Sequence, residues 1–149
     1  MSYYSSMLPG SVADLYEEDE LKINLEALAK WSGAEFILGK VSRISGDDQR
    51  VYLEGGQVIE YDLLSINIGS KTKAVDHIPG VWEHSLTTRS LNELIPKIKR
   101  REVDLKVQGI VPEVVVCGAG AAGTELSFAF KARWTKQFGQ DVKVKLLCY

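Results

Sequence analysis

The chain has 149 residues and a formal net charge of -2, with 45% hydrophobic and 26% charged residues. Its length suits one ordinary domain, and its composition is that of a soluble globular protein. The near-neutral charge gives no reason to expect nucleic acid or an anionic membrane as a partner. Because the chain has no apolar run of membrane-spanning length and no signal-peptide pattern, we expect a cytoplasmic or organelle-interior protein that is not secreted.

The N-terminal residues 3–16 show no helical or strand period long enough to found a domain. We expect residues 7–10, with the sequence MLPG, to form a turn, because proline presets one backbone dihedral and glycine permits another. The acidic run 17–20 predicts a solvated loop or the approach to a helix. It has no further ligands at a suitable spacing, so we expect no metal site there.

A short helix and an antiparallel β-meander are predicted next. Asn24 is a good N-cap, and the helical spacing that begins at Leu25 stops at Gly33. Four strand candidates follow, and turn formers separate the last three of them. The four runs are 34–38, 41–45, 50–53 and 57–61.

Residues 63–68 form a nearly continuous apolar run, which is typical of a strand buried in a parallel sheet. The run ends at Gly69 and Ser70, where a backbone without side-chain bulk can meet a ligand. Residues 71–88 then predict a connector. Its histidines, His77 and His84, are isolated from other candidate ligands or nucleophiles, so we expect ordinary loop residues.

Residues 90–93 have the S-x-x-E form of a capping box, and helical spacing continues from there to Arg101. Pro96 conflicts with this helix, because proline removes a hydrogen bond and should kink it. The basic residues 97–101 favour a solvated helix end over a nucleic-acid patch. The segment 103–111 stays open, since its valines and leucine alternate as in a strand while Gly109 interrupts the pattern.

The strongest motif is a G-x-G-x-x-G turn between an apolar strand, 114–117, and a helical pattern. In this context the motif indicates dinucleotide binding. Gly118 lets the chain leave the strand, Gly120 lets the backbone approach a pyrophosphate, and Gly123 lets the helix pack closely. The alternative is a glycine-rich turn that only allows tight packing. The six residues of the turn are Gly118, Ala119, Gly120, Ala121, Ala122 and Gly123.

The helix after this turn has a predicted sheet-facing side. Its members share helical spacing and are Leu126, Ala129, Phe130, Arg133 and Trp134. Gly139 predicts the end of the helix, and residues 142–147 predict a second strand. Cys117 and Cys148 form no C-x-x-C pattern. Because both fall in strands that should be buried, we expect small core side chains in preference to a redox pair.

Taken together, these stretches resemble the FAD-dependent pyridine nucleotide-disulfide oxidoreductase superfamily. The nearest branch resembles the type II NADH dehydrogenase-like flavoproteins, including the module fused to selenide, water dikinase. The resemblance lies in residues 3–16, in EYDLLSINIGS (60–70), in IPGV (78–81) and in VVVCGAGAAGTELSFAF (114–130). It implies an α/β FAD/NAD(P)-binding two-domain Rossmann-like fold, present here in part.

The resemblance also implies a domain organisation. Residues 1–71 are similar to the C-terminal part of an FAD-binding domain, a helix plus a β-meander and a strand. Residues 72–111 are a connector containing the helix 90–101. Residues 112–149 are similar to the first βαβ unit of the inserted NAD(P)H-binding domain.

The same resemblance implies the site residues. Gly118 to Gly123 would bind NAD(P)H, while Val41, Gly69 and Ser70 would lie near FAD, Val41 by its backbone approach to adenine. Glu125 would orient the nicotinamide. Its alternative is a first-turn carboxylate that the helix dipole favours. No metal site is expected.

Departures from the family pattern matter as well. The family's own FAD fingerprint has no counterpart, Ser6 stands where the family often has glycine, and the segment for a redox cysteine pair holds none. We therefore expect a fragment. An acidic residue about 20 positions beyond the motif would grip the ribose, and Cys148 or the next residue has that place, so NAD and NADP are not distinguished.

The function implied is that of an oxidoreductase passing hydride from NAD(P)H to FAD and on to a quinone-like or other acceptor. The partners are then a nicotinamide nucleotide and an electron acceptor. Two alternatives stay open. One is a truncated or degenerate, non-enzymatic isoform without flavin binding, and the other is a single-Rossmann domain that uses only the glycine turn.

Overall fold

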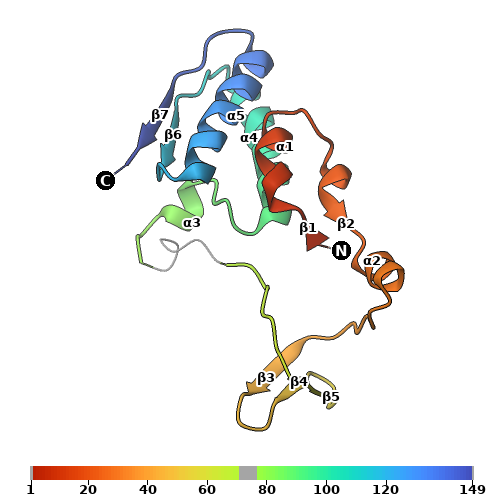
Figure 1. The fold of residues 1–149 in the computed structure, drawn as a ribbon. Helices are drawn as coiled ribbons and strands as arrows, with labels where there is room; N and C mark the ends of the chain where they lie inside the picture. The colour runs from red at the N-terminus through yellow and green to blue at the C-terminus, as the bar shows by residue number, and fades with distance from the viewer. Residues whose placement is uncertain (1, 71–76, 149) are drawn as a thin grey trace. The chain divides into compact units, whose positions relative to one another are not determined.

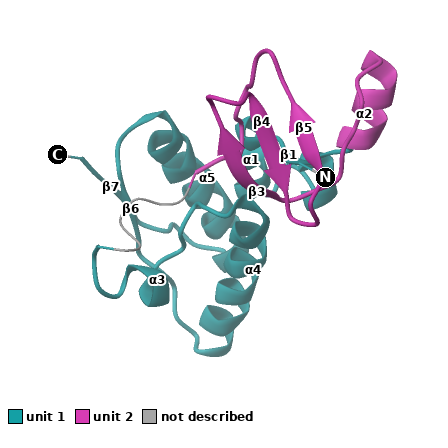
Figure 2. Ribbon diagram, turned by 90° about the horizontal axis from the view of Figure 1, so that it is seen from below, with its two compact units in different colours: residues 1–24, 71–149 teal, residues 25–70 magenta. Residues whose placement is uncertain are grey.

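The computed structural model describes residues 2–70 and 77–148. The chain divides into two compact units, which Figure 2 colours separately. Unit 1 comprises Met1–Asn24 and Lys71–Tyr149, and unit 2 comprises Leu25–Ser70. The three-part division expected from the resemblance stays a prediction, and each unit is described by itself below.

Unit 1 contains three groups of elements (Figure 1). Its N-terminal part has β1 (Ser2–Tyr3), the 3-10 helix η1 (Ser5–Met7), α1 (Leu8–Val12), the 3-10 helix η2 (Glu18–Leu21) and β2 (Lys22–Ile23). The helices α3 (Val81–His84) and α4 (Leu91–Val107) follow. The third group is β6 (Val114–Cys117), α5 (Ala121–Phe138) and β7 (Val144–Leu147), of which β6 and β7 pair in parallel.

This third group is the predicted strand–helix–strand unit. Val114 lies opposite Val144 and Cys117 opposite Leu147, so the carboxyl ends of both strands meet at one edge. Gly139 ends α5 with a φ of 67°, the left-handed conformation that glycine adopts most readily. The expected inner face of α5 is confirmed, because its buried residues are Leu126, Ala129, Phe130, Arg133 and Trp134.

The core of unit 1 lies between α1, α4, α5 and β6. Fully buried residues from well-separated segments meet there, namely Val12, Leu21, Leu94, Ile98 and Val142. Trp134 packs edge-on against Phe130 and Phe138, with ring centroids 5.3 and 6.3 Å apart. Aromatic pairs in this geometry add to the stabilisation from buried area alone.

The expectation for the N-terminus was wrong. Residues 7–10 form no isolated turn, since Pro9 and Gly10 lie in α1, whose Leu8 and Val12 are buried in the core. Proline is tolerated in a first helical turn because its missing N–H has no intrahelical partner there. A Cβ on Gly10 would lie 2.3 Å from Tyr16 Cε2, so this glycine admits an aromatic ring.

The helix α4 also differs from expectation. It begins as predicted but continues through Pro96 to Val107, so residues 103–107 of the ambiguous segment are helical and residues 108–111 are neither helix nor strand. The expected capping box is absent: the Ser90 side chain makes no cap hydrogen bond, and Glu93 pairs with Lys97 at 2.7 Å. Burial of Leu94, Ile95, Ile98 and Leu105 offsets the hydrogen bond that proline removes.

Unit 2 confirms the antiparallel meander. It contains α2 (Leu25–Ser32), β3 (Val41–Ser45), β4 (Arg50–Leu53) and β5 (Val58–Glu60), with β4 between the other two strands. Val51 and Leu53 on β4 are its buried residues. Arg50 pairs with Glu60 across β4 and β5 at 2.7 Å.

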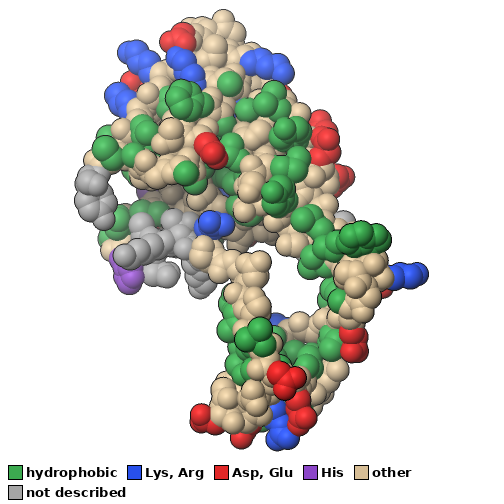
Figure 3. Space-filling view, viewed as in Figure 1, with side chains coloured by type: hydrophobic (Ala, Val, Ile, Leu, Met, Phe, Trp, Pro, Cys, Tyr) green, Lys and Arg blue, Asp and Glu red, His purple; other side chains and the backbone are tan. Residues whose placement is uncertain are grey.

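Two strand predictions in unit 2 were wrong. Residues 34–38 and 63–68 form no strand, and Leu63 and Ile68 are 92% and 90% exposed. An apolar run becomes a buried strand only when strands lie beside it and layers cover it. None of the described strands pairs with either segment. Figure 3 shows that apolar side chains lie on the surface of both parts of the chain.

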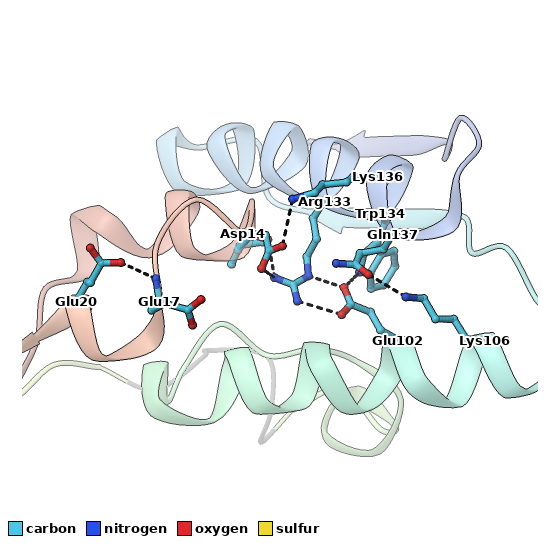
Figure 4. Close-up of polar contacts among 10 residues, drawn as sticks. Asp14, Glu17, Glu20, Glu102, Lys106, Arg133, Trp134, Lys136 and Gln137 are labelled. Atoms are coloured by element: carbon cyan, nitrogen blue, oxygen red, sulfur yellow. Dashed lines mark hydrogen bonds and ion pairs between the residues drawn. The ribbon is translucent and has the colours of Figure 1, made fainter.

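A buried ion pair between α4 and α5 is the centre of a hydrogen-bond network that also reaches α1 (Figure 4). Arg133 of α5 donates hydrogen bonds from Nε and Nη2 to the two carboxylate oxygens of Glu102 on α4, the second over 3.0 Å. Trp134 Nε1 donates to the same carboxylate at 2.8 Å, and Arg133 Nη1 reaches Asp14 and the Val12 carbonyl, both at 3.4 Å. The network therefore ties α5 to α4 and to the end of α1.

The charges of this pair compensate one another. The side chains of Arg133 and Glu102 are only 3% and 8% exposed. Burial disfavours the charged guanidinium, but the hydrogen bond and charge of Glu102, with the charge of Asp14, outweigh it and raise the pKa of Arg133. Arg133 is therefore charged and paired with Glu102 in the folded protein, and loss of either partner would leave a buried charge without a counter-charge.

Replacing Glu102 by glutamine should lower the free energy of unfolding by about 3–5 kcal/mol, because Arg133 then stays buried without a counter-charge. Urea unfolding followed by circular dichroism measures this loss. Glu93→Gln is the control, since the Glu93–Lys97 pair is exposed and should contribute less than about 1 kcal/mol. Equal losses in the two variants would contradict the buried-pair account.

Candidate functional site

The turn between β6 and α5 begins with a conformation that glycine makes possible. Gly118 has a φ of 110°, which side-chain-bearing residues rarely adopt, and its N–H donates to the Leu147 carbonyl at 2.9 Å. The bond fixes the start of the turn to the end of β7. The turn therefore lies at the carboxyl edge of the parallel pair, where open α/β sheets bind their ligands.

Gly123 lets α5 lie against this turn. A Cβ placed on Gly123 would lie 1.7 Å from the Gly118 carbonyl oxygen and 3.7 Å from Val116 Cγ1. Only a hydrogen atom fits in this space, so helix and strand approach as closely as their backbones allow. The third glycine of the motif thus has the packing role that was predicted for it.

Gly120 is in a different environment. It is the N-cap of α5, with φ -69° and ψ 177°, a conformation open to any residue, and a Cβ there would meet nothing within 4 Å. A Cβ on Gly118 would also face open space. The first N–H groups of a helix have no intrahelical partner and carry a partial positive charge. Open backbone and free donors together form a surface suited to phosphate oxygens.

Glu125 lies beside this surface. It is exposed in the second turn of α5 and lines a cavity of about 180 Å³ within unit 1. Residues from three segments complete the lining: Ser5, Ser6, Leu8 and Pro9, then Thr88, Arg89 and Leu91, then Ala122 and Leu126. The cavity brings together Ser6, Arg89 and Glu125, which are far apart in sequence.

The residues expected near FAD lie in unit 2. Val41 begins β3 and is half exposed, and Gly69 has a φ of 78° with open space where a Cβ would stand. Gly69 thus offers a bare backbone, as expected from its sequence. Together with Ser70 these residues belong to a unit separate from the glycine turn, so their role toward FAD stays a prediction.

Metal ligands and the two histidines were considered in the sequence analysis, and the structure describes their surroundings. Among residues 2–70 and 77–148, no group of three or more histidine, cysteine or acidic side chains is placed to hold a metal ion. Residues 18–20 of the acidic run lie in η2, and Glu17, at its N-cap, forms a capping box with Glu20. His77 and His84 are exposed.

The expectation of buried cysteines was wrong, since Cys117 and Cys148 are both exposed. Cys117 ends β6 on the face opposite Val116, whose side chain approaches Gly123 of α5. Cys148 follows the last residue of β7 and lies outside the strand. The sequence pattern identified the two strands, but it did not show which face of β6 or which end of β7 α5 leaves uncovered.

The buried partnership of Glu102 with Arg133 was missed at the sequence level. A signal was available, because each charged residue interrupts an apolar helical stripe: Glu102 follows Leu94 and Ile98 on α4, and Arg133 stands between Phe130 and Trp134 on α5. Opposite charges on two apolar stripes favour a buried pair. Arg89 was also missed as a residue of the cavity beside Glu125.

Comparison with known sequences gives one curated relative. No protein-family model matches the chain. Over 98 residues, or 62% of this chain, the sequence is 34% identical to alternative NAD(P)H-ubiquinone oxidoreductase C1, chloroplastic/mitochondrial, of Arabidopsis thaliana. The match spans 18% of that relative's length, so the chain corresponds to less than a fifth of it.

Comparison with solved structures extends over nearly the whole chain. NADH:rubredoxin oxidoreductase from Clostridium acetobutylicum matches 97% of it with a TM-score of 0.55 and 22% identity. Putidaredoxin reductase, in its covalent complex with putidaredoxin, matches 98% with a TM-score of 0.59 and 18% identity. The chain covers 35% and 33% of these proteins, respectively.

The structural likeness establishes a shared fold, and part of the sequence is similar to an NAD(P)H oxidoreductase. No helix in the described part of the chain is long and apolar enough to cross a membrane. The glycine turn, the parallel strand pair and the meander all follow the predicted FAD/NAD(P)-binding, Rossmann-like pattern. The sequence match and the shared fold therefore support the predicted resemblance to the FAD-dependent pyridine nucleotide-disulfide oxidoreductase superfamily.

Proposed function

We propose that the chain supplies the nicotinamide-nucleotide site of an FAD-dependent oxidoreductase that passes hydride from NAD(P)H to FAD and on to a quinone-like or other acceptor. The observation that carries this proposal is the β6–α5 turn, in which Gly123 is packed against the Gly118 carbonyl while Gly120 faces open space. A turn needed only for packing requires the first condition. A turn that also receives a pyrophosphate requires both.

The proposed role of the turn follows from its free donors. The phosphate oxygens would accept hydrogen bonds from the first N–H groups of α5, and the helix dipole would stabilise their charge. Glu125, one turn further along α5, would then lie beside the nicotinamide end of the nucleotide and orient it. Its exposed carboxylate on the wall of the cavity supports this role.

When bound, NAD(P)H and FAD would supply the redox chemistry, which is hydride transfer between them. For FAD, the proposal rests on the family resemblance and on the bare backbone at Gly69, with Val41 and Ser70 assigned by resemblance. For the acceptor, the curated relative is named for ubiquinone and one structural relative for rubredoxin. A quinone is the acceptor that we propose, because the sequence match is to the ubiquinone enzyme. That relative is named as chloroplastic/mitochondrial, which supports an organelle interior.

The intact turn argues against a degenerate, non-enzymatic copy. Without selection for nucleotide binding, a side chain at Gly120 would cost little, because space is open there. Glycine nonetheless stands at that position. A yellow purified protein that oxidises NADH with a quinone or dye acceptor would support the oxidoreductase. A colourless protein that binds NADH would restrict the proposal to the nucleotide site.

Gly120→Ala tests the nucleotide site directly. Its Cβ would occupy the space through which a pyrophosphate approaches, so NADH affinity should fall about tenfold or more, the equivalent of one hydrogen bond to a charged group. Isothermal titration calorimetry with NADH measures the change. Stability should fall by no more than about 1 kcal/mol, since the backbone conformation suits alanine and only N-cap preference is lost.

The matched control for this variant is Gly46→Ala. Gly46 lies in a turn of unit 2, and a Cβ there also meets nothing within 4 Å. It should leave NADH binding unchanged. If the Gly120→Ala variant also binds NADH with unchanged affinity, the proposed nucleotide site is contradicted.

Gly123→Ala should give the opposite pattern. Its Cβ would lie 1.7 Å from a backbone oxygen that cannot rotate away, so α5 or β6 must shift. We expect a loss of about 3 kcal/mol or more in the free energy of unfolding, measured by urea titration. A fully stable Gly123→Ala protein would show that the close approach is not required.

Glu125→Gln tests the orienting role. NADH affinity should fall about threefold to tenfold, because a hydrogen bond involving a charged group becomes a weaker neutral one. Affinity for ADP-ribose, which lacks the nicotinamide, should not change. Glu83→Gln, an exposed carboxylate on α3, is the control. Equal weakening of NADH and ADP-ribose would place Glu125 at the wrong end of the nucleotide.

A further inference from the structure

Two exposed thiols lie at the edge of the sheet that carries the glycine turn. Cys117 is the last residue of β6 and directly precedes Gly118, and Cys148 directly follows the last residue of β7. Because β6 and β7 are parallel, their carboxyl ends meet at the same edge. The proposed hydride transfer uses neither thiol.

Strand register places these cysteines one diagonal step apart. Cys117 lies opposite Leu147, the residue before Cys148. A strand spacing of about 4.8 Å and a rise of about 3.3 Å per residue give a diagonal Cα–Cα distance of about 6 Å. Disulfides form at Cα–Cα distances of about 4.4–6.8 Å, so the two backbones stand at a bridging distance.

Side-chain direction is the second requirement. Pleating would put neighbouring positions on opposite faces, but Cys148 lies past the end of β7 and the pleat does not fix its side chain. Rotation about φ of Cys148 turns its side chain while the preceding peptide unit stays in place. The 2.9 Å hydrogen bond from Gly118 N–H to the Leu147 carbonyl therefore survives this rotation.

We propose that Cys117 and Cys148 are a modification site, a thiol pair that peroxide converts reversibly into a disulfide that weakens nucleotide binding. The effect of the disulfide on nucleotide binding rests on the proposed function, because it assumes that the turn binds a nucleotide. The bridge would stand between Gly118, at the mouth of the pyrophosphate site, and the end of the second strand. In dinucleotide-binding units the end of that strand lies beside the ribose.

The chemistry balances with peroxide as the oxidant. One thiolate attacks the O–O bond, forming a sulfenic acid and, after proton transfer, water. The second thiolate attacks the sulfenic sulfur, the S–S bond forms, and a second water leaves. Two thiols are thus oxidised to one disulfide while one hydrogen peroxide is reduced to two waters. A dithiol such as dithiothreitol reverses the bridge by thiol–disulfide exchange.

The test of the bond uses the full chain at low concentration with hydrogen peroxide, followed by non-reducing tryptic mapping. Trypsin cuts after Lys106, Lys131 and Lys145, which separates the cysteines into peptides 107–131 and 146–149. We expect these two peptides to be joined within a monomer and released by dithiothreitol. Cys117→Ser and Cys148→Ser should each abolish the joined product. Separate peptides carrying sulfinic acid, or bridges only between chains, would overturn the proposal.

The test of the consequence compares NADH titrations of reduced and oxidised protein. We expect about tenfold weaker binding after oxidation, the loss of one hydrogen bond to a charged phosphate, restored by dithiothreitol and absent in both serine variants. A bridged protein with unchanged affinity would overturn the effect on nucleotide binding. If the reduced protein fails to bind NADH, the proposed function fails, while the mapping still decides whether the bond forms.

Discussion

The close approach of α5 to the end of β6 is the constraint on which unit 1 depends. It exists because Gly123 has no Cβ, which would otherwise lie 1.7 Å from the Gly118 carbonyl oxygen. With the helix start fixed there, its inner face meets α1, α4 and both strands, and the apolar cluster around Phe130 and Trp134 becomes continuous. One missing methyl group therefore governs both the packing of the helix and the position of its free N–H groups. Fold and candidate nucleotide site have the same origin.

The other half of α5 is held in a different way. Arg133 and Trp134 converge on Glu102, so a charged pair and an indole N–H stand where apolar contacts would have sufficed for burial. A buried pair adds little net stability compared with well-packed apolar residues, but it has strict directional requirements. Both hydrogen bonds from the planar guanidinium to the carboxylate can form in only one arrangement of α4 relative to α5. We infer that the pair fixes the rotation of α5, while apolar burial supplies most of the stability.

Local signals explain why part of the fold could be predicted from the sequence. Turn glycines, strand length and helical spacing identified β6, α5, β7 and the meander, and with them the glycine turn itself. Predictions that depended on distant partners failed. The run 63–68 has the composition of a buried strand yet is largely exposed. Residues 7–10 have the composition of a turn, yet residues 8–10 lie in α1, which packs on α5. The Glu102–Arg133 pair was likewise missed, because its partners are 31 positions apart and only the fold brings their two apolar helical stripes together.

Parallel pairing explains why several chemical groups collect at one edge. Two parallel strands bring their carboxyl ends together, so whatever follows each strand becomes a neighbour of whatever follows the other. Here the glycine turn follows β6 and Cys148 follows β7, and Cys117 is the last residue of β6. Because Gly118 donates its N–H to Leu147, a change in the backbone at the end of β7 reaches the turn through one hydrogen bond. A group that modifies this edge would therefore act on the candidate nucleotide site through backbone geometry as well as through contact.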